Sequence, residues 1–214
     1  MPDFSIENSL GLAKNAAIAG VDEVGRGPLA GPVTAAALVI NRTKSLGALS
    51  ALVDDSKKLS ASRRAALMPA IEDVSTLALG WASREEIDRL NILGATLLAM
   101  RRAVDDLSAC LGRMPDFALI DGNRDPGLTC PTRTVVKGDG ISVSIAAASI
   151  VAKVARDRMM KDLATRYPGY GWERNAGYGT SEHLVALNRL GPTPEHRRSF
   201  APVRVAKKNF ADLS

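Results

Sequence analysis

The chain has few of the residues that carry the commonest kinds of enzyme catalysis. It contains two cysteines, two histidines and no GxSxG sequence among 214 residues. Cys110 and Cys130 form no CxxC pair or other metal-binding spacing. His183 and His196 do not lie in an HExxH sequence. These absences argue against a zinc hydrolase and a serine hydrolase of the GxSxG type, and we expect the two thiols to be free.

Long apolar runs are also missing from the sequence. The longest, such as residues 33–40, are far too short to cross a bilayer. Residues 1–7 lack the basic start and apolar core of a signal peptide. We therefore expect a cytoplasmic protein without a membrane anchor.

Length and composition are those of a globular protein with a sizeable core. Apolar residues make up 46% and charged residues 24% of the chain, which is ordinary for such proteins. A chain of 214 residues permits one or two domains. Because it contains no internal repeat, low-complexity tract or linker, the sequence favours a single catalytic domain over residues 1–214, with a lead-in over about 1–15 and a basic tail over about 204–214.

Positive charge exceeds negative charge, by 28 basic to 23 acidic residues, and the sequence pI is about 9.4. A basic protein attracts polyanions, so nucleic acid is a natural class of partner. Basic residues cluster in an internal segment and near the C-terminus, where they form either a track for phosphates or ordinary solvated surface. The clusters are Lys57, Lys58, Arg63 and Arg64, and Arg197, Arg198, Arg204, Lys207 and Lys208.

One apolar stretch ends in two adjacent acids. Residues 16–23 are mostly small and apolar, as in a buried strand, and finish at Asp22 and Glu23. Burying an ionised carboxylate costs several kcal/mol unless a positive group meets it, so this pattern indicates a cation site. From these residues alone, a solvated acidic turn explains the pattern equally well.

Two later apolar runs repeat this pattern. Residues 117–120 lead into Asp121, and residues 132–136 are followed by Asp139. If the three strands lie side by side, about 4.8 Å apart, their carboxylates meet at one edge of a sheet. Four carboxylates balance the charge of two divalent cations, and such a pair can hold an attacking water and a leaving oxygen in line on a phosphodiester. Magnesium suits a ligand set made only of oxygens.

Periodicity and capping residues predict the other elements. Residues 32–40 should form a strand paired with the first in a hairpin, which argues against reading Gly25-x-Gly27-x-x-Ala30 as the dinucleotide-binding fingerprint that opens a helix. Long helices and one more strand should follow. Helices are expected from Ser60 with a kink or restart at Pro69, from the capping box Ser83–Glu86, over residues 141–167, and from Thr180 to Leu190, with the strand over residues 76–81.

Seven short segments of the chain carry a family resemblance. They are VDEVGRGP at residues 21–28, DSKKL at 55–59, LNIL at 90–93, LIDGN at 119–123, VKGD at 136–139, AASIVAK at 147–153 and HRRSF at 196–200. Together, from about residue 17 to residue 203, they resemble bacterial ribonuclease HII, a type 2 ribonuclease H. The resemblance implies an α/β fold of the ribonuclease H-like type, a mixed five-stranded sheet flanked by helices with a helical C-terminal part.

The resemblance also implies an activity and a metal site. The activity is endonucleolytic hydrolysis of the RNA strand of RNA–DNA hybrids and cleavage at single ribonucleotides embedded in duplex DNA. The family's catalytic, metal-binding acids fall on Asp22, Glu23, Asp121 and Asp139, which are the four acids that the strand argument selects. Two Mg²⁺ or Mn²⁺ ions per active site are implied.

The resemblance further implies how nucleic acid is bound. The partners would be RNA–DNA hybrid and ribonucleotide-containing duplex DNA. Separately from the resemblance, we expect a monomer that does not bind membranes. Gly179 stands where some relatives carry a proline, so the sequence departs from theirs directly after the tyrosine implied to stack on a sugar. The implied substrate-binding residues are Gly25, Arg26 and Gly27 for the ribonucleotide, Lys57 for a phosphate and Tyr178 for stacking on a sugar.

Two other functions stay open beside this one. A resolvase or integrase-like nuclease of the same fold would use similar acids on DNA. A non-catalytic nucleic-acid-binding protein would explain the basic charge, but not three strands that each lead to an acid.

Overall fold

The chain forms two compact units. The computed structural model describes residues 2–43 and 60–211. The single domain predicted from the sequence stays a prediction. The first unit, called the sheet unit, comprises Met1–Val24, Thr34–Trp81 and Leu97–Val154, and the second, called the C-terminal unit, comprises Gly25–Val33, Ala82–Thr96 and Ala155–Ser214.

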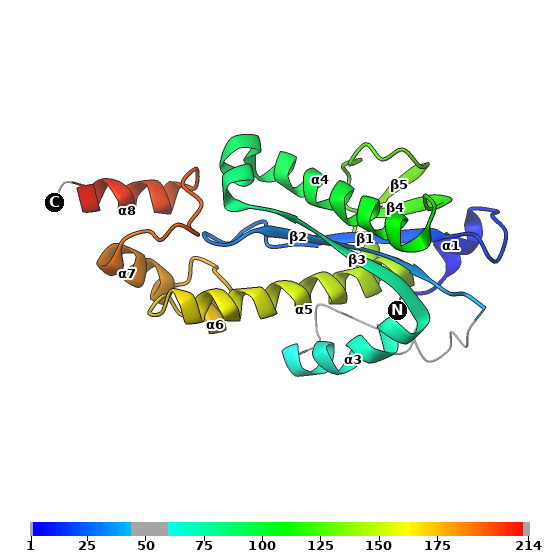
Figure 1. The fold of residues 1–214 in the computed structure, drawn as a ribbon, viewed down its shortest axis with the longest axis horizontal. Helices are drawn as coiled ribbons and strands as arrows, with labels where there is room; N and C mark the ends of the chain where they lie inside the picture. The colour runs from blue at the N-terminus through cyan, green and yellow to red at the C-terminus, as the bar shows by residue number, and fades with distance from the viewer. Residues whose placement is uncertain (1, 44–59, 212–214) are drawn as a thin grey trace. The chain divides into compact units, whose positions relative to one another are not determined.

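A mixed sheet forms the centre of the sheet unit. Its strands in the described part of the chain are β1 (Ile18–Val24), β2 (Val33–Ile40), β3 (Ser75–Ala82), β4 (Phe117–Asp121) and β5 (Thr132–Val135). They lie in the order β3-β2-β1-β4-β5 (Figure 1). β1 and β2 pair antiparallel as the predicted hairpin, while β4 runs parallel to both β1 and β5. The condition on which the convergence of the acids depends, that the three strands leading to them lie side by side, is met by β1, β4 and β5.

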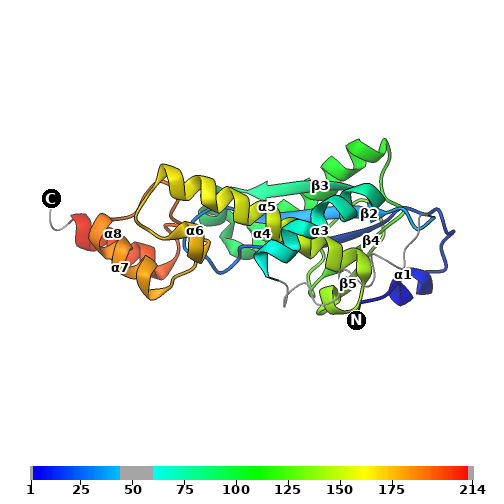
Figure 2. The ribbon, with the colours of Figure 1, turned by 90° about the horizontal axis from the view of Figure 1, so that it is seen from below.

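Helices cover both faces of this sheet. α3 (Ala61–Val74) and the first half of α5 (Val143–Arg166) lie on one face (Figure 1 and Figure 2). The part of α4 (Arg84–Leu111) that belongs to the sheet unit lies on the other face. Leu38 of β2 and Ile71 of α3 are fully buried in the core that lies between the sheet and the helices α3 and α5.

Two glycines let helices approach the sheet closely. A Cβ on Gly20 of β1 would lie 2.2 Å from the carbonyl carbon of Ser144 in α5. A Cβ on Gly80 of β3 would lie 2.0 Å from the carbonyl oxygen of Ala99 in α4. Only glycine fits at such distances. The backbone of α5 therefore packs directly against β1, two residues before Asp22.

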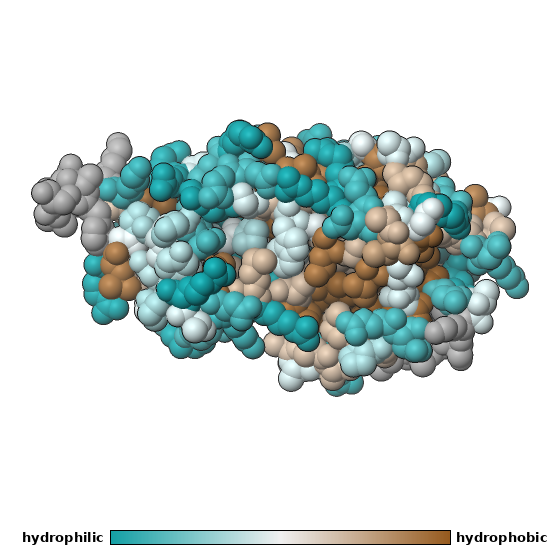
Figure 3. All heavy atoms as spheres, viewed as in Figure 1, coloured by the Kyte–Doolittle hydropathy of each residue, from teal (hydrophilic) through white to brown (hydrophobic). Residues whose placement is uncertain are grey.

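Hydrophobic side chains gather over the edge strand β3 on the face shown in Figure 3. Leu77 and Leu79 are half-buried there and pack against the core. β3 lies at the opposite edge of the sheet from β5. Its apolar side chains therefore belong to the packing of the sheet unit.

The predicted helix starts are confirmed. The side chains of Ser60 and Thr180 cap α3 and α7 (Ser181–Leu190). The capping box also forms: the amide of Ser83 donates to the Glu86 carboxylate at 2.9 Å, and the amide of Glu86 donates to the Ser83 hydroxyl at 3.3 Å.

The lead-in predicted over about residues 1–15 contains a short helix that the sequence analysis does not predict. Residues 5–9 form α1 (Ser5–Ser9). Glu7 is buried and accepts a hydrogen bond from the Ser142 hydroxyl at 2.7 Å. The backbone of Asp3 also pairs with Ile141 and Val143, so polar contacts that follow no periodic pattern in the sequence hold this segment at the start of α5.

Two helices depart from the expected course. α3 continues through Pro69, where the sequence predicts a kink or restart. α4 is instead broken at Asn91, whose φ is 60° and ψ 171°. The Asn91 side-chain oxygen accepts from the amides of Leu93 and Gly94, at 2.9 and 3.1 Å, and so caps the second half of α4.

The C-terminal unit is largely helical, as the sequence predicts. It contains the start of α4, the end of α5, α6 (Trp172–Asn175), α7 and α8 (Ala201–Ala211). Tyr170 and Trp172 stack in its core with their ring centroids 5.2 Å apart. Across the described residues, no helix is both long enough and apolar enough to span a bilayer.

We predict that Gly20→Ala lowers the free energy of unfolding by about 1–3 kcal/mol, because the added methyl has to displace the backbone of α5. Gly140→Ala is the matched control: a Cβ there meets no atom within 4 Å. Its free energy of unfolding should stay within about 0.5 kcal/mol of the wild type. Urea unfolding followed by circular dichroism measures both variants, and equal stabilities would contradict the close approach of α5 to β1.

Candidate active site

Three carboxylates converge where β1 and β4 end. Asp22, Glu23 and Asp121 each offer an oxygen atom, and these atoms lie within 4.8 Å of one another. The parallel register pairs Val21 with Ile120, so the acids that follow them, Asp22 and Asp121, emerge side by side. The structure thus brings together three of the four acids that the sequence selects.

The fourth acid, Asp139, lies outside this group of three. It is buried in the short 3-10 helix η1 (Gly138–Gly140), which follows β5. The amide of Gly138 donates to Oδ1 of Asp121 at 2.6 Å, which ties the turn that carries Asp139 to the site. A role for Asp139 as a metal ligand stays a prediction.

Negative charge is crowded at this site. Asp22 is buried, with 5% of its surface exposed. Burial first, and then the charges of Glu23 and Asp121, raise the pKa of the Asp22 carboxyl well above its ordinary value. Hydrogen bonds from the Ser149 hydroxyl and from the Glu23 amide, the latter at 2.7 Å, act in the opposite direction. A divalent cation among these oxygens would offset both the desolvation and the repulsion.

A cavity of about 350 Å³ opens at the acids. Arg64 of α3 and Ser149 and Lys153 of α5 line it together with them. Positive side chains beside acids that could hold a metal ion suit a ligand that carries phosphate. The sequence analysis places Arg64 in a basic cluster that could track phosphates, but it gives no separate role to Ser149 or Lys153. Ser149 and Lys153 are four residues apart on a helix predicted to cover the sheet, and that spacing is the signal that could have found them.

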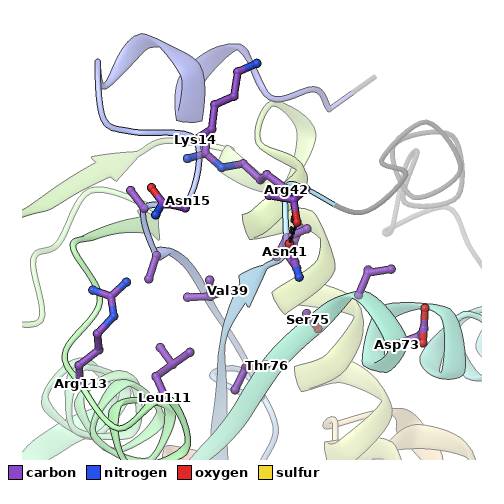
Figure 4. A pocket seen from close by; sticks show the side chains of 15 residues that line it. Lys14, Asn15, Val39, Asn41, Arg42, Asp73, Ser75, Thr76, Leu111 and Arg113 are labelled. Carbon is purple, nitrogen blue, oxygen red and sulfur yellow. Dashed lines mark hydrogen bonds between the residues drawn. The ribbon is translucent and has the colours of Figure 1, made fainter.

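A larger cavity, of about 480 Å³, lies elsewhere in the sheet unit (Figure 4). Its lining includes residues before β1 and after β2, at the opposite end of β1 from the acids. Lys14, Arg42 and Arg113 line it. Arg42 donates to the carbonyl of Ala13 at 3.1 Å, and Arg113 donates to Asp116 at 2.8 Å. The one metal-ligand cluster found among the described residues lies at the smaller cavity, so size alone does not mark the functional site.

The turn predicted to read the ribonucleotide, residues 25–27, belongs to the C-terminal unit. Gly25 has a φ of +94°, and a Cβ there would lie 2.2 Å from Nε of the buried Arg156. A Cβ on Gly27 would lie 3.3 Å from the ring of Tyr178, which is 44% exposed. Two of the predicted substrate-binding elements are therefore in contact. The third, Lys57, lies outside the described residues.

One residue of the C-terminal basic cluster is not on the surface. Arg197 is fully buried, so assigning it to a surface track for phosphates is wrong. Its guanidinium donates to the carbonyls of Gly25 and Arg26 at 2.6 and 3.0 Å. Burial, and then the charge of Arg156, lower the pKa of Arg197 to about 9. The sequence has no local signal for this contact, because 172 residues separate Gly25 from Arg197.

Two buried histidines form a hydrogen-bonded chain behind Tyr178. Nδ1 of His196 accepts from the amide of Thr193 at 2.9 Å, so its Nε2 carries the hydrogen and faces Nε2 of His183 at 3.1 Å. Nε2 of His183 also accepts from Trp172 at 3.1 Å. Nδ1 of His183 donates to the carbonyl of Tyr178 at 2.9 Å. Both imidazole rings are neutral in this series of hydrogen bonds. The bond from His183 to the Tyr178 carbonyl fixes the backbone of Tyr178.

Comparison with known proteins identifies the family. The family model for ribonuclease HII matches residues 19–203. The chain belongs to the ribonuclease HII family. Ribonuclease HII of Paramagnetospirillum magneticum is 60% identical over 203 residues, which cover 95% of this chain and 97% of that protein. Ribonuclease HII of Rhodospirillum rubrum is 60% identical over 208 residues, covering 96% of this chain and 92% of that protein. The family resemblance is confirmed, and with it a nuclease of the ribonuclease H type.

Solved structures confirm the ribonuclease H-like α/β fold. Ribonuclease H2 from Pyrococcus horikoshii is similar with a TM-score of 0.75 and 27% identity, covering 91% of this chain and 98% of that chain. A ribonuclease HIII in complex with Mn²⁺ has a TM-score of 0.72 and 21% identity, covering 94% of this chain and 71% of that chain. The second likeness shows the fold alone.

We predict that Asp22→Asn lowers the affinity of the protein for Mn²⁺ by more than about tenfold, because it removes a charged ligand. The same change should leave the thermal stability of the metal-free protein unchanged or raise it, since it removes one of several buried, repelling charges. Isothermal titration and thermal melts measure the two effects. Asp106→Asn, on an exposed part of α4, is the matched control. A destabilised Asp22→Asn protein with wild-type metal affinity would refute the ligand assignment.

The histidine chain generates a prediction about pH. Burial, and then the neighbouring His183, lower the pKa of His196 to about 3, from an ordinary value of 6.5. The unfolded chain therefore takes up a proton near pH 6.5 that the folded protein takes up only near pH 3. The contribution of neutral His196 to the free energy of unfolding is therefore complete above pH 6.5. It falls by about 1.4 kcal/mol per pH unit, for one proton, as the pH is lowered toward 3.

His196→Gln tests this prediction, because glutamine keeps a donor for His183 and does not titrate. Urea unfolding between pH 7 and pH 5 should give a pH slope smaller by about one proton in the variant than in the wild type. Identical slopes would mean that His196 is protonated in the folded protein.

Proposed function

We propose that this protein is a metal-dependent endonuclease that hydrolyses the RNA strand of RNA–DNA hybrids and cuts at single ribonucleotides embedded in duplex DNA. One observation carries the proposal. Asp22, Glu23 and Asp121 converge at the ends of adjoining parallel strands, in a chain of the ribonuclease HII family. Carboxylates in this arrangement suit metal-assisted attack on a phosphodiester.

The proposed cofactor is Mg²⁺ or Mn²⁺, with two ions per active site. The donor set fits such ions, because it consists of carboxylate oxygens within 4.8 Å of one another, with Asp22 buried and crowded by like charge. Asp139 completes the proposed ligand set. Held by these carboxylates, such ions would supply a nucleophilic water and stabilise the leaving oxygen. The Mn²⁺ complex of a ribonuclease HIII with this fold supports the choice of metal.

The chain's own residues arrange this chemistry. Ser149 hydrogen-bonds Asp22 and so orients a ligand carboxylate. Lys153 and Arg64 bring positive charge to the same cavity, where the scissile phosphate would lie. The proposed reaction therefore requires no side chain as nucleophile, in agreement with the scarcity of cysteine and histidine.

Selection of ribose is assigned to the turn of residues 25–27 and to Tyr178. Metal ions promote attack on any phosphodiester held beside them, so discrimination has to come from the 2′-hydroxyl, which both donates and accepts hydrogen bonds. Gly27 has no side chain and lies against the Tyr178 ring, so a sugar can approach the backbone closely. The exposed face of Tyr178 would stack on the neighbouring sugar, and Lys57 would contact a phosphate. The monomeric state and the cytoplasmic location stay predictions.

Cleavage of three duplexes tests the proposal. One carries a single ribonucleotide, one is a continuous RNA–DNA hybrid and one is all DNA. We expect cleavage of the first two with Mg²⁺ or Mn²⁺, none with EDTA, and an intact all-DNA duplex. Cleavage of the all-DNA duplex would favour a resolvase or integrase-like nuclease, and binding without cleavage would favour a non-catalytic nucleic-acid-binding protein.

We predict that Tyr178→Ala reduces cleavage at a single ribonucleotide by about tenfold or more, because loss of an aromatic stacking partner costs about 1–3 kcal/mol for a base and we expect a cost of that order for the sugar. The loss on a continuous hybrid should be smaller, because the neighbouring sugar there is a ribose. Tyr178→Phe keeps the ring and serves as the control. Initial rates on the two duplexes measure the effect, and equal losses on both would leave Tyr178 as a packing residue.

A further inference from the structure

A fully buried arginine holds the turn that is proposed to read the sugar. Arg197 has 0% of its surface exposed. Its guanidinium donates to four backbone carbonyls: Gly25 at 2.6 Å, Arg26 at 3.0 Å, Gly31 at 2.9 Å and Pro32 at 3.1 Å. All of these residues belong to the C-terminal unit. One planar group thus fastens both sides of the loop that leaves β1 and enters β2.

This arginine is buried without an ion pair among the described residues. Its charge is met by carbonyl dipoles and by the face of Phe200, whose ring centroid lies 5.3 Å from the guanidinium carbon. The nearby Asp88 carboxylate instead accepts from the amides of Arg198 and Ser199, at 3.0 and 2.8 Å. Burying a guanidinium in this way is costly, and an apolar side chain would fill the same space at lower cost. The contacts of Arg197 therefore fix the conformation of the turn more than they add to stability.

Anchoring the carbonyls also fixes the direction of the amides. In a planar trans peptide, the C=O of one residue and the N–H of the next point in opposite directions. The described chain contains no cis peptide. Because the carbonyls of Gly25 and Arg26 point at the buried Arg197, the N–H groups of Arg26 and Gly27 point away from it. Successive amides directed to one side form a donor site for an oxygen atom.

We propose that Arg197 is a positioning residue for ribose selection, which orients the amides of Arg26 and Gly27 toward the 2′-hydroxyl by holding the carbonyls of Gly25 and Arg26. The inference rests on the proposed function, because it explains how the proposed reading turn is kept in shape. Because Arg197 is fully buried, we propose that it acts on the substrate only through the turn. Lysine cannot replace it, since an ammonium is a point donor and lacks the planar fork that reaches carbonyls on two sides.

Arg197→Lys tests the inference through two constants measured with Mg²⁺ present. These are KM for the duplex with one ribonucleotide and the inhibition constant Ki of the all-DNA duplex as a competitor. We expect KM to rise about tenfold, as for the loss of one well-directed hydrogen bond, and Ki to stay within about twofold of the wild type. Partial unfolding lowers kcat by reducing the amount of active enzyme and leaves both constants unchanged.

Two control variants accompany this measurement. Arg166→Lys makes the same chemical change on an exposed part of α5 in the same unit. Ile87→Ala removes a fully buried side chain of the unit and lowers stability without touching the turn. Both should keep the wild-type KM and Ki.

Thermal melts establish which variants fold. Arg197→Gln, which keeps a planar amide donor, takes the place of Arg197→Lys if the latter is unfolded. Unfolding of both assigns Arg197 to stability alone and overturns the inference. A folded variant with wild-type KM, beside a wild-type enzyme that selects ribose, overturns this inference and leaves the proposed function intact. A wild-type protein that cleaves neither RNA-containing duplex overturns both.

Discussion

The parallel pairing of β1 with β4 is the constraint on which the candidate metal site depends. In this register, Ile18, Gly20 and Asp22 share one face of β1, and Leu119 and Asp121 share the same face of β4. A slip of one residue would turn Asp121 to the opposite face and separate it from Asp22. Gly20 lets α5 approach that face, which also brings Ser149 to the acids. The register and the close packing of one helix therefore act together, and neither is specific to metal chemistry.

The two units bury charged side chains of opposite sign. In the sheet unit, carboxylates crowd together and the fold leaves the Asp22 carboxyl with a raised pKa, which favours a cation as the missing partner. In the C-terminal unit, Arg156 and Arg197 are buried together and each is bonded to backbone carbonyls. The histidines of that unit stay neutral, because burial lowers the pKa of both and the neighbouring His183 lowers that of His196 further. The crowded carboxylates of the sheet unit favour binding of a cation, whereas the buried arginines of the C-terminal unit fix the backbone to which they are bonded.

Local patterns predicted the hairpin, the capped helices and the acids that follow the strands, because each depends on alternation or on nearby residues. The mixed five-stranded sheet came from the family resemblance, and the convergence of the acids was conditional on their strands being neighbours, which the pairing of β1 with β4 fulfils for three of them. Asp139 was harder to place, since the acid lies in a 3-10 helix beyond the end of β5 rather than on the strand. Long-range polar contacts escaped prediction for a physical reason. Every residue has a backbone carbonyl, so any residue can accept a hydrogen bond from a buried guanidinium. The hydrogen bond from Arg197 to Gly25 therefore requires no particular residue type that would reveal the partner in the sequence. Asn91 was missed because a single side chain that caps a new helical segment does not disturb the periodicity around it.

The two glycines of the reading turn have different physical requirements, and this affects what their substitution can show. Gly25 has a positive φ, and a Cβ added to it would lie 2.2 Å from Nε of Arg156. A side chain at this position would therefore displace the buried arginine, whatever its effect on a substrate. Gly27 has no such φ, and its Cβ would meet only the Tyr178 ring at 3.3 Å. Loss of activity on changing Gly25 therefore cannot separate sugar reading from the packing of the turn. Gly27 can separate them, because its only near neighbour is the exposed aromatic ring that belongs to the same proposed sugar site.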